Sequence, residues 1–339
     1  AYGQALNDAY ALDGRDPSSV VGVQWCHGLF DRPFHPPAPI LGLVRQRDLR
    51  THMSRLDMDA YRAHTDRPAS ETSHPIVVIG AGLAGAVAAR LLADHGFDVV
   101  VLDKGRRVGG RCSRRALDDV VVTHGARHVH DWPEWMTAWC DGENTVMVQD
   151  DSTTSMRLMD GPETIAGWLN GIDVVTGTTV VRIEQNGDQW HVHDEEGSRW
   201  EATGVVVTAP LPQLHRMMPG APESWSNHAY RPTWSVVLAH GTPPPAAFRP
   251  TLENLGFEVE ESDGTTGAVV HFPHDWSQSH LEDERTDVVQ AFMDMTRGVD
   301  NEVLDWLKSA TCQSHRWRYG RADALGVESA FPRLVEAGD

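Results

Sequence analysis

Lysine is almost missing from this chain of 339 residues, since it occurs only at positions 104 and 308. Acidic residues outnumber basic ones by 48 to 29, and the net charge is −19. The excess lies after residue 70, because residues 1–70 balance eight arginines against eight aspartates. A strongly acidic segment repels the phosphate backbone of nucleic acid. We therefore expect residues 75–339 to have no nucleic-acid partner.

Cysteine is also scarce, and long apolar runs are absent. The four cysteines stand far apart with no C-x-x-C pair, which predicts neither a disulfide framework nor a zinc site, so we expect no metal and a reducing compartment. No uninterrupted run reaches the roughly 18 apolar residues that a membrane-spanning helix requires. The chain also opens without a signal-peptide pattern. We therefore expect a cytoplasmic protein without a membrane partner.

A glycine-rich stretch carries the first functional signal. Residues 76–79 are a run of β-branched residues, which predicts a buried parallel strand. Glycines follow in the pattern G-x-G-x-x-G, and residues 84–93 are small and aliphatic, which predicts a helix. A second apolar run over residues 98–102 ends at Asp103. This order of strand, glycine turn, helix, strand and acid is typical of dinucleotide binding.

Each glycine of the pattern has a predicted role. Gly80 allows the tight turn, Gly82 lets a pyrophosphate approach the backbone, and Gly85 lets the helix pack on the strand. Asp103 stands where an acid accepts hydrogen bonds from a ribose hydroxyl. The helix start, at Leu83 and Ala84, offers free N–H groups and a positive dipole end to phosphate.

The residues after Asp103 distinguish FAD from NAD. Lys104 begins a basic turn that ends in Gly109-Gly110-Arg111. This Gly-Gly-Arg after the ribose acid resembles the flavin-containing amine oxidase superfamily, in which that arginine contacts the FAD pyrophosphate. An arginine fork suits phosphate oxygens. The resemblance therefore implies FAD as cofactor, bound in part by Lys104, Gly110 and Arg111.

Further runs resemble the renalase-like branch of bacterial FAD amine oxidases. His124-Gly125-Ala126 matches a run that lies close to the flavin ring in that branch, although Thr123, Arg127 and His128 depart from its Asp, Gln and aromatic residue. The run Pro232-Thr233-Trp234 and a later one at 314–319 also match. The resemblance implies a flavin-proximal position for His124, Trp317 and Tyr319, and cofactor contacts for Gly125, Ala126, Val180, Ala209, Gly338 and Asp339.

The first 65 residues resemble something else. They contain A-L-D-G-R-D-P, then G-x-x-W-C-x-G-x-x-D-R-P and P-I-x-G-x-V-R, in the order found at the C-terminal end of class II DNA photolyases. Phe34 stands where that family more often has tryptophan. A polar stretch at 66–74 is predicted to be a linker. DNA is an expected partner only if residues 1–65 belong to a complete photolyase.

Together these patterns predict an α/β fold and an oxidoreductase. The resemblance implies hydride transfer from an amine or a dihydropyridine-type small molecule to flavin N5, with reoxidation by O2. Two alternatives stay open: a fragment of a photolyase–oxidoreductase fusion, and a non-catalytic remnant that lacks the family's C-terminal helix. The predicted parts are a Rossmann-type FAD-binding domain (75–130, 172–215 and 312–339), an inserted mixed-sheet substrate domain (131–171 and 216–311) and a short, mostly helical or irregular N-terminal segment.

Overall fold

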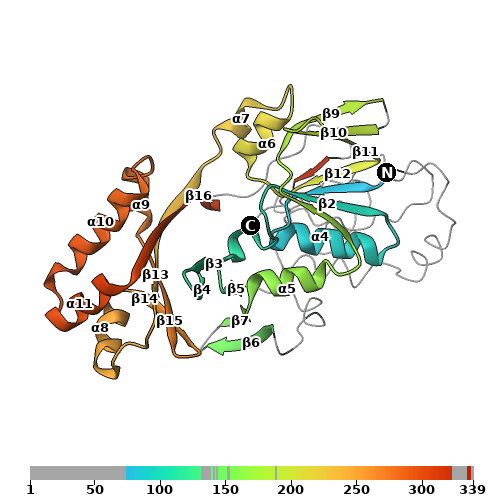
Figure 1. Cartoon of the computed structure of the whole chain (residues 1–339). Coiled ribbons are helices and arrows are strands. Elements are labelled where there is room, and N and C mark those ends of the chain that lie inside the picture. The colour runs from blue at the N-terminus through green and yellow to red at the C-terminus, as the bar shows by residue number, and fades with distance from the viewer. Residues whose placement is uncertain are drawn as a thin grey trace, which may run out of the picture.

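The computed structural model describes residues 74–130, 139, 142, 144–150, 153–187, 189–322 and 334–336. The photolyase-like segment, all of the linker except His74, and Gly338 and Asp339 lie outside these residues, so the predictions made for them stay predictions. The described part forms two lobes (Figure 1). One is built on a parallel sheet and the other on an antiparallel sheet.

The parallel-sheet lobe confirms the Rossmann-type prediction. Its strands run in the order β17-β12-β1-β2-β8, and every neighbouring pair is parallel. Helix α4 connects β1 to β2, as a parallel crossover requires. All four residues of β1 are buried because both faces of the sheet are covered. The elements are β1 (Ile76–Ile79), α4 (Leu83–Asp94), β2 (Val99–Asp103), β8 (Asp173–Thr176), β12 (Gly204–Val207) and β17 (Leu334–Glu336).

Alternating residues of β1 pack into hydrophobic clusters on opposite faces of the parallel sheet. Val78 packs on the α4 side, in the same cluster as Ile165 of α5, whereas Val77 packs on the opposite side with Trp190 and Leu214. This alternation follows from the strand period of two. The second side is covered by an antiparallel three-stranded sheet and by α6 and α7. On the α4 side lies α5 (Gly161–Trp168), and the elements on the second side are β9 (Val180–Asn186), β10 (Gln189–Asp194), β11 (Arg199–Ala202), α6 (Leu211–Met217) and α7 (Glu223–Ser226).

The antiparallel-sheet lobe has the strand order β14-β15-β13-β16. Its described strands pair antiparallel throughout, which refines the predicted mixed sheet. Helices α8 to α11 pack on it around Trp234, Leu238 and Phe292. The elements are β13 (Tyr230–His240), α8 (Arg249–Asn254), β14 (Phe257–Ser262), β15 (Thr265–His271), α9 (His274–Ser279), α10 (Arg285–Met295), α11 (Asn301–Ser309) and β16 (Thr311–Ala322).

A hairpin of the first lobe packs on the sheet of the second. This hairpin joins β3 (Arg114–Leu117) to β4 (Val120–Thr123). Val122 is fully buried in one cluster with Val237 and Val269 of the antiparallel sheet. A Cβ on Gly267 would lie 2.9 Å from a methyl group of Val122, so glycine is needed for this close contact. The two lobes are therefore held together by buried apolar surface.

The region between the lobes differs from the sequence prediction. Here β6 (Thr145–Asp150) and β7 (Thr153–Leu158) form a hairpin that pairs with β5 (His128–His130), which the sequence did not predict. Residues 156–169 share their buried cluster with α4, whereas the prediction assigned 131–171 to the substrate domain. Apolar residues at 156, 158 and 165 cause this, because they face the α4 side of the parallel sheet. The other domain boundaries stay predictions.

No helix of the described residues is both long enough and apolar enough to cross a membrane.

Candidate functional site

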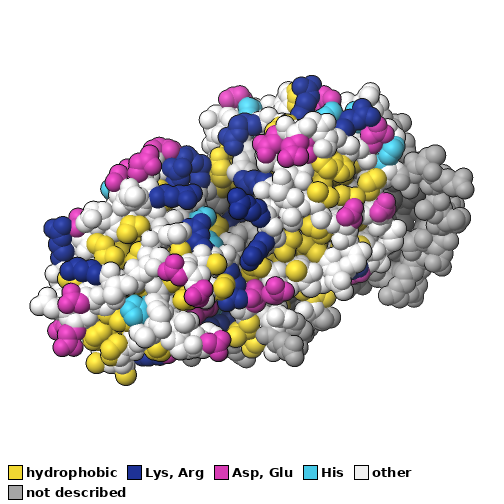
Figure 2. Space-filling model, viewed as in Figure 1, with side chains coloured by type: hydrophobic (Ala, Val, Ile, Leu, Met, Phe, Trp, Pro, Cys, Tyr) yellow, Lys and Arg dark blue, Asp and Glu magenta, His cyan; other side chains and the backbone are white. Residues whose placement is uncertain are grey.

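A cavity of about 2020 Å³ opens between the lobes and takes its walls from both. In Figure 2 it is the hollow around which Lys and Arg side chains gather. Most residues predicted to bind the cofactor meet here, although they come from five separate parts of the chain. Those that line the cavity are Gly80, Gly82, Leu83, Ala84, Asp103, Lys104, Gly110, Arg111, Ala126, Val180 and Ala209.

The start of α4 forms an anion site in one wall of the cavity. Its N-cap residue, Gly82, is extended, no side chain caps the helix, and its first turn holds no acid. The first N–H groups are thus left for a ligand. Gly110 lies against Gly82, since a Cβ on Gly110 would stand 2.9 Å from the Gly82 Cα. This bare backbone fits the pyrophosphate of a dinucleotide.

Arg111 supplies positive charge beside that backbone. Its Nη1 donates to the carbonyl oxygen of Gly320 at 3.1 Å, which fixes the guanidinium in the cavity wall, where its fork suits phosphate oxygens. Burial lowers the pKa of Arg111, while Cys112 and Tyr230 act in the opposite direction. A bound phosphate would offset this loss of hydration. The residues present therefore fit the phosphate part of FAD.

Asp103 is held rigidly at the end of β2. One of its carboxylate oxygens accepts from the backbone N–H of Ala81 and the other from that of Gly105, each at 2.6 Å. Each carboxylate oxygen can accept a further hydrogen bond, as a ribose hydroxyl would donate. The neighbouring Lys104 reaches Gln213 at 3.4 Å and lines the same wall.

Gly85 and Gly125, which were predicted to contact the cofactor, do not line the cavity but allow close packing next to it. A Cβ on Gly85 would lie 1.8 Å from the carbonyl oxygen of Gly80, and a Cβ on Gly125 would lie 2.0 Å from that of Arg111. Real Cβ atoms do not come so close, so only glycine permits these contacts. The predicted packing role of Gly85 agrees with this geometry. Gly125 holds the Arg111 backbone in place, and neither glycine lines the cavity.

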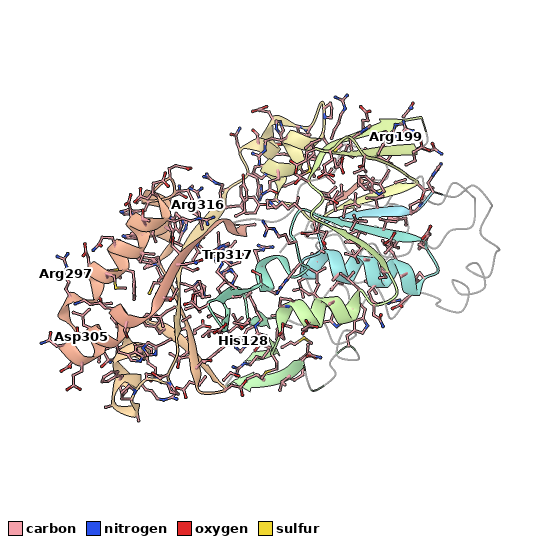
Figure 3. All side chains as sticks on the ribbon, viewed as in Figure 1. His128, Arg199, Arg297, Asp305, Arg316 and Trp317 are labelled. Atoms are coloured by element: carbon pink, nitrogen blue, oxygen red, sulfur yellow. The ribbon has the colours of Figure 1, made fainter. Side chains whose placement is uncertain are left out.

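Aromatic side chains of β16 also line the cavity. Trp317 and Tyr319 are part of its wall, whereas His124 does not line it and is only 3% exposed. The rings of His124 and Trp317 have their centres 5.2 Å apart. Trp317 Nε1 donates to Ser235 Oγ at 3.1 Å. Figure 3 shows Trp317 between the lobes, on β16. A fixed indole of this kind can form one wall for a planar ring.

Sequence reasoning missed His315 and Arg115, which adjoin these side chains. Arg115 Nη2 lies 3.0 Å from His315 Nδ1, and because arginine only donates, Nδ1 accepts and Nε2 carries the hydrogen. Burial, then His124 and Arg115, lowers the pKa of His315 to about 3. Burial, then Arg115, lowers the pKa of His124 to about 4. Both rings are therefore neutral near pH 7.

Arg127 explains a departure from the renalase-like run. It is 8% exposed and forms salt bridges with Glu258 at 3.0 Å and Glu260 at 2.5 Å, both on β14. Its Nη2 also donates to the carbonyl oxygen of Thr123 at 2.9 Å. Arg127 thus ties the run to the antiparallel sheet. No sequence signal marked Glu258 or Glu260, because these partners lie more than a hundred residues away.

Basic side chains dominate the cavity wall. Nine Lys and Arg residues line it against three acids, although the chain as a whole is acidic. Arg316 and Arg318 are paired with Glu282. Within the described residues, Arg285 and Arg321 have no carboxylate within ion-pair distance. The nine are Lys104, Arg107, Arg111, Arg114, Arg216, Arg285, Arg316, Arg318 and Arg321, and the acids are Asp103, Asp160 and Glu163.

The cavity lies between a Rossmann-type lobe and an antiparallel sheet that contributes aromatic side chains. This arrangement is that of an FAD-dependent oxidoreductase. Comparison with known families agrees. Residues 78–141 match the NAD(P)-binding Rossmann-like domain, and residues 158–324 match the flavin containing amine oxidoreductase family. Over this range the chain is similar to the flavin-containing amine oxidase family, and its cofactor is FAD. The predictions of fold class, enzyme class and cofactor are confirmed.

Solved structures support the same fold. Putrescine oxidase bound to putrescine is similar over 79% of this chain and 93% of its own, with a TM-score of 0.56 and 13% identity. A protein described as a protoporphyrinogen oxidase from Exiguobacterium sp. 255-15 is similar over 79% of this chain and 94% of its own, with a TM-score of 0.56 and 13% identity. At this identity the likeness concerns the fold alone.

Curated relatives match over short stretches. A zeta-carotene-forming phytoene desaturase from Myxococcus xanthus is 50% identical over 50 residues, which is 15% of this chain and 10% of the relative. An L-amino-acid oxidase from Notechis scutatus scutatus is 39% identical over 69 residues, 20% of this chain and 13% of the relative. A deoxyribodipyrimidine photo-lyase from Oryza sativa subsp. japonica is 38% identical over 69 residues, 20% of this chain and 13% of the relative. These matches therefore span only 10% to 13% of the length of the relatives.

Proposed function

We propose that the protein oxidises an anionic dihydropyridine-type substrate, such as a reduced nicotinamide nucleotide, by hydride transfer to FAD with reoxidation by O2. We prefer an anionic substrate to an amine because the cavity wall is positively charged. On the substrate side it contributes Arg285, Arg316, Arg318 and Arg321 and no acid. A cleft lined by one sign of charge attracts ligands of the opposite sign.

An alkyl amine is disfavoured by the same wall. Such an amine is a cation near pH 7, as lysine is, and it would approach Arg285 and Arg321, which have no carboxylate partner within the described residues. A nucleotide carries phosphate, which arginine binds through charge-assisted, often bidentate hydrogen bonds. Arg285 lies next to Arg115 and His315, whose pKa values its charge helps to lower. A substrate phosphate or carboxylate would relieve this repulsion between like charges.

The roles of the chain's own residues follow from their positions. When bound, FAD would supply the two-electron acceptor for the hydride, with O2 as the final oxidant. The α4 start, Asp103 and Arg111 hold the cofactor. Trp317, whose indole is fixed by a hydrogen bond to Ser235, orients planar rings in the cavity. Hydride transfer needs no acid–base pair, which agrees with the neutral, buried state of His124.

Substrate preference tests the proposal directly. The flavoprotein should be reduced under anaerobic conditions by reduced nicotinamide nucleotides, including their ring isomers, and hardly at all by benzylamine or putrescine. Oxidised-flavin absorbance after rapid mixing reports the rate. Efficient reduction by the amines, with none by the nucleotides, would overturn the choice of substrate while leaving the flavoenzyme class intact.

Arg285→Gln should raise KM for the nucleotide substrate roughly ten- to a hundredfold, because a hydrogen bond to a charged group contributes about 1.5–3 kcal/mol. The rate constant for flavin reduction at saturation should change less. Arg297→Gln is the matched control, since Arg297 is 74% exposed, pairs with Asp294 and lies at the far end of the same lobe in Figure 3. Equal KM values in the two variants would remove Arg285 from the substrate site.

The photolyase-like segment stays a prediction. It lies outside the described residues, and the photo-lyase relative covers only a short stretch.

A further inference from the structure

We propose that Glu184, His191 and His193 form a binding site for a divalent transition-metal ion of the zinc type. These three side chains belong to β9 and β10, on the sheet that covers the Rossmann lobe. Their ligand atoms all lie within 4.8 Å of one another. Two imidazoles and one carboxylate are a donor set that zinc uses, with water as a fourth ligand.

The strand geometry places the three side chains on one face. His191 and His193 are two residues apart on β10, so both point to the same side of the sheet. Glu184 is directly opposite His191 in the β9–β10 pairing. Directly opposed and diagonal residues of antiparallel strands lie close enough for their side chains to meet. The cluster therefore follows from the backbone and does not depend on a loop.

Two of the ligand atoms already have the spacing of a metal site. His193 Nε2 lies 3.3 Å from Glu184 Oε1. Two ligands at about 2.1 Å from a zinc ion, at a tetrahedral angle, stand about 3.4 Å apart. His193 Nε2 is also buried and makes no hydrogen bond within the described residues. A metal ion would satisfy this nitrogen, and His191, whose ligand atom lies within 4.8 Å of the other two, would be the third ligand.

The opposite face of β10 is packed in the core, which holds the strand and its two histidines in place. Trp190 and Val192, which alternate with the histidines, are fully buried in the core beneath. A metal site gains affinity when its ligands do not have to be ordered on binding. His193 is 28% exposed and Glu184 35% exposed, so an ion can enter from solvent.

Charged side chains surround Glu184 and the two histidines. Arg182 donates to Glu184 Oε2 at 2.7 Å, while Oε1 faces His193 Nε2 at 3.3 Å, the gap that a metal ion would bridge. Such an outer hydrogen bond orients a ligand. On the other side, β11 places Glu201 opposite His191 and Arg199 opposite His193. Arg199 is paired with Glu201, so the face is close to neutral around the histidines.

The site is separate from the cofactor cavity. Neither histidine nor Glu184 lines that cavity. Arg199, which marks the neighbouring strand in Figure 3, lies at the far end of the lobe from Trp317. An ion bound here would cross-link β9 and β10 and stabilise the folded state, because it binds the folded chain better than the unfolded one.

Zinc titration of the full chain, first stripped of metal with a chelator, tests the proposal. Calorimetry should show zinc binding that weakens at least ten- to a hundredfold in His191→Ala, His193→Ala and Glu184→Gln, since loss of even an outer-shell partner costs roughly that much. Zinc should also raise the Tm of the wild type and not that of the three variants. This second measurement does not depend on enzyme activity.

His215→Ala is the matched control. His215 also has a glutamate beside it, Glu223 at 3.6 Å, but no second histidine. This variant should bind zinc as the wild type does. Zinc affinity that is unchanged in all three site variants, or no zinc-dependent rise in Tm, would overturn the proposal. FAD content, compared across all the proteins, shows that each variant is folded.

Discussion

Gly85→Ala should yield a protein that is destabilised and retains no FAD. The added Cβ would lie 1.8 Å from the carbonyl oxygen of Gly80 and 3.3 Å from Thr208 Oγ1. The first of these neighbours is backbone of the glycine turn and cannot rotate away. Helix α4 must therefore move off β1, which takes its N-terminal N–H groups away from the phosphate site. Overpacking of this kind costs typically about 1–3 kcal/mol.

Gly167→Ala is the control for that experiment. Gly167 also lies inside a helix, α5, but a Cβ there would meet no atom within 4 Å. Alanine is the better helix former by about 1 kcal/mol, so this variant should keep its FAD and be at least as stable as the wild type. Denaturant unfolding and flavin content measure both effects. If both variants retain FAD equally, the close packing of α4 on the glycine turn is not required for binding.

Acid should destabilise the protein through its buried histidines. Burial lowers the pKa of His124 from 6.5 to about 4, so the unfolded chain takes up a proton in this range that the folded chain does not. Stability is therefore fully present above pH 6.5 and is lost as the pH falls towards 4. At about 1.4 kcal/mol per pH unit, His124 alone accounts for a loss of about 3 kcal/mol. His315 acts in the same direction.

His124→Asn should flatten this dependence. The free energy of unfolding, measured by denaturant titration at several pH values between 6.5 and 4, should fall less steeply in the variant than in the wild type. The carboxylates contribute equally to both proteins, so the difference in slope reports the histidine. His315→Asn should flatten the slope as well, since the two rings lie 4.8 Å apart and share Arg115. Parallel slopes in all three proteins would show that these histidines are not neutral in the folded state.

The cofactor end could be predicted from the sequence because its signals are local. The strand, the glycine turn and Asp103 stand within thirty residues, and a parallel crossover brings the ends of β1 and β2 to one edge of the sheet. Gly110 and Arg111 follow directly. The structure places these residues around one cavity. Gly125 was identified only through its family run, and its contact with the Arg111 backbone explains why that run needs glycine.

The substrate end could not be predicted in the same way. Arg115 and His315 are two hundred residues apart, and they meet only because the β3–β4 hairpin packs on the antiparallel sheet. Arg285 opens a helix whose sequence gives no hint that its first residue faces a cavity. The β6–β7 hairpin was missed because its strands are short and rich in polar residues. Its position is set by apolar contacts with α4, which are distant in sequence.

The cofactor released on denaturation tests the central claim most directly. The purified full chain should show a flavin absorbance spectrum, and heating or acid should release FAD in stoichiometric amount, identified by chromatography against FAD, FMN and NAD standards. This result is expected because Asp103, Arg111 and the bare start of α4 match a dinucleotide and the aromatic wall matches a planar ring. Release of NAD, or tight binding of NAD by a protein with no flavin, would contradict the account.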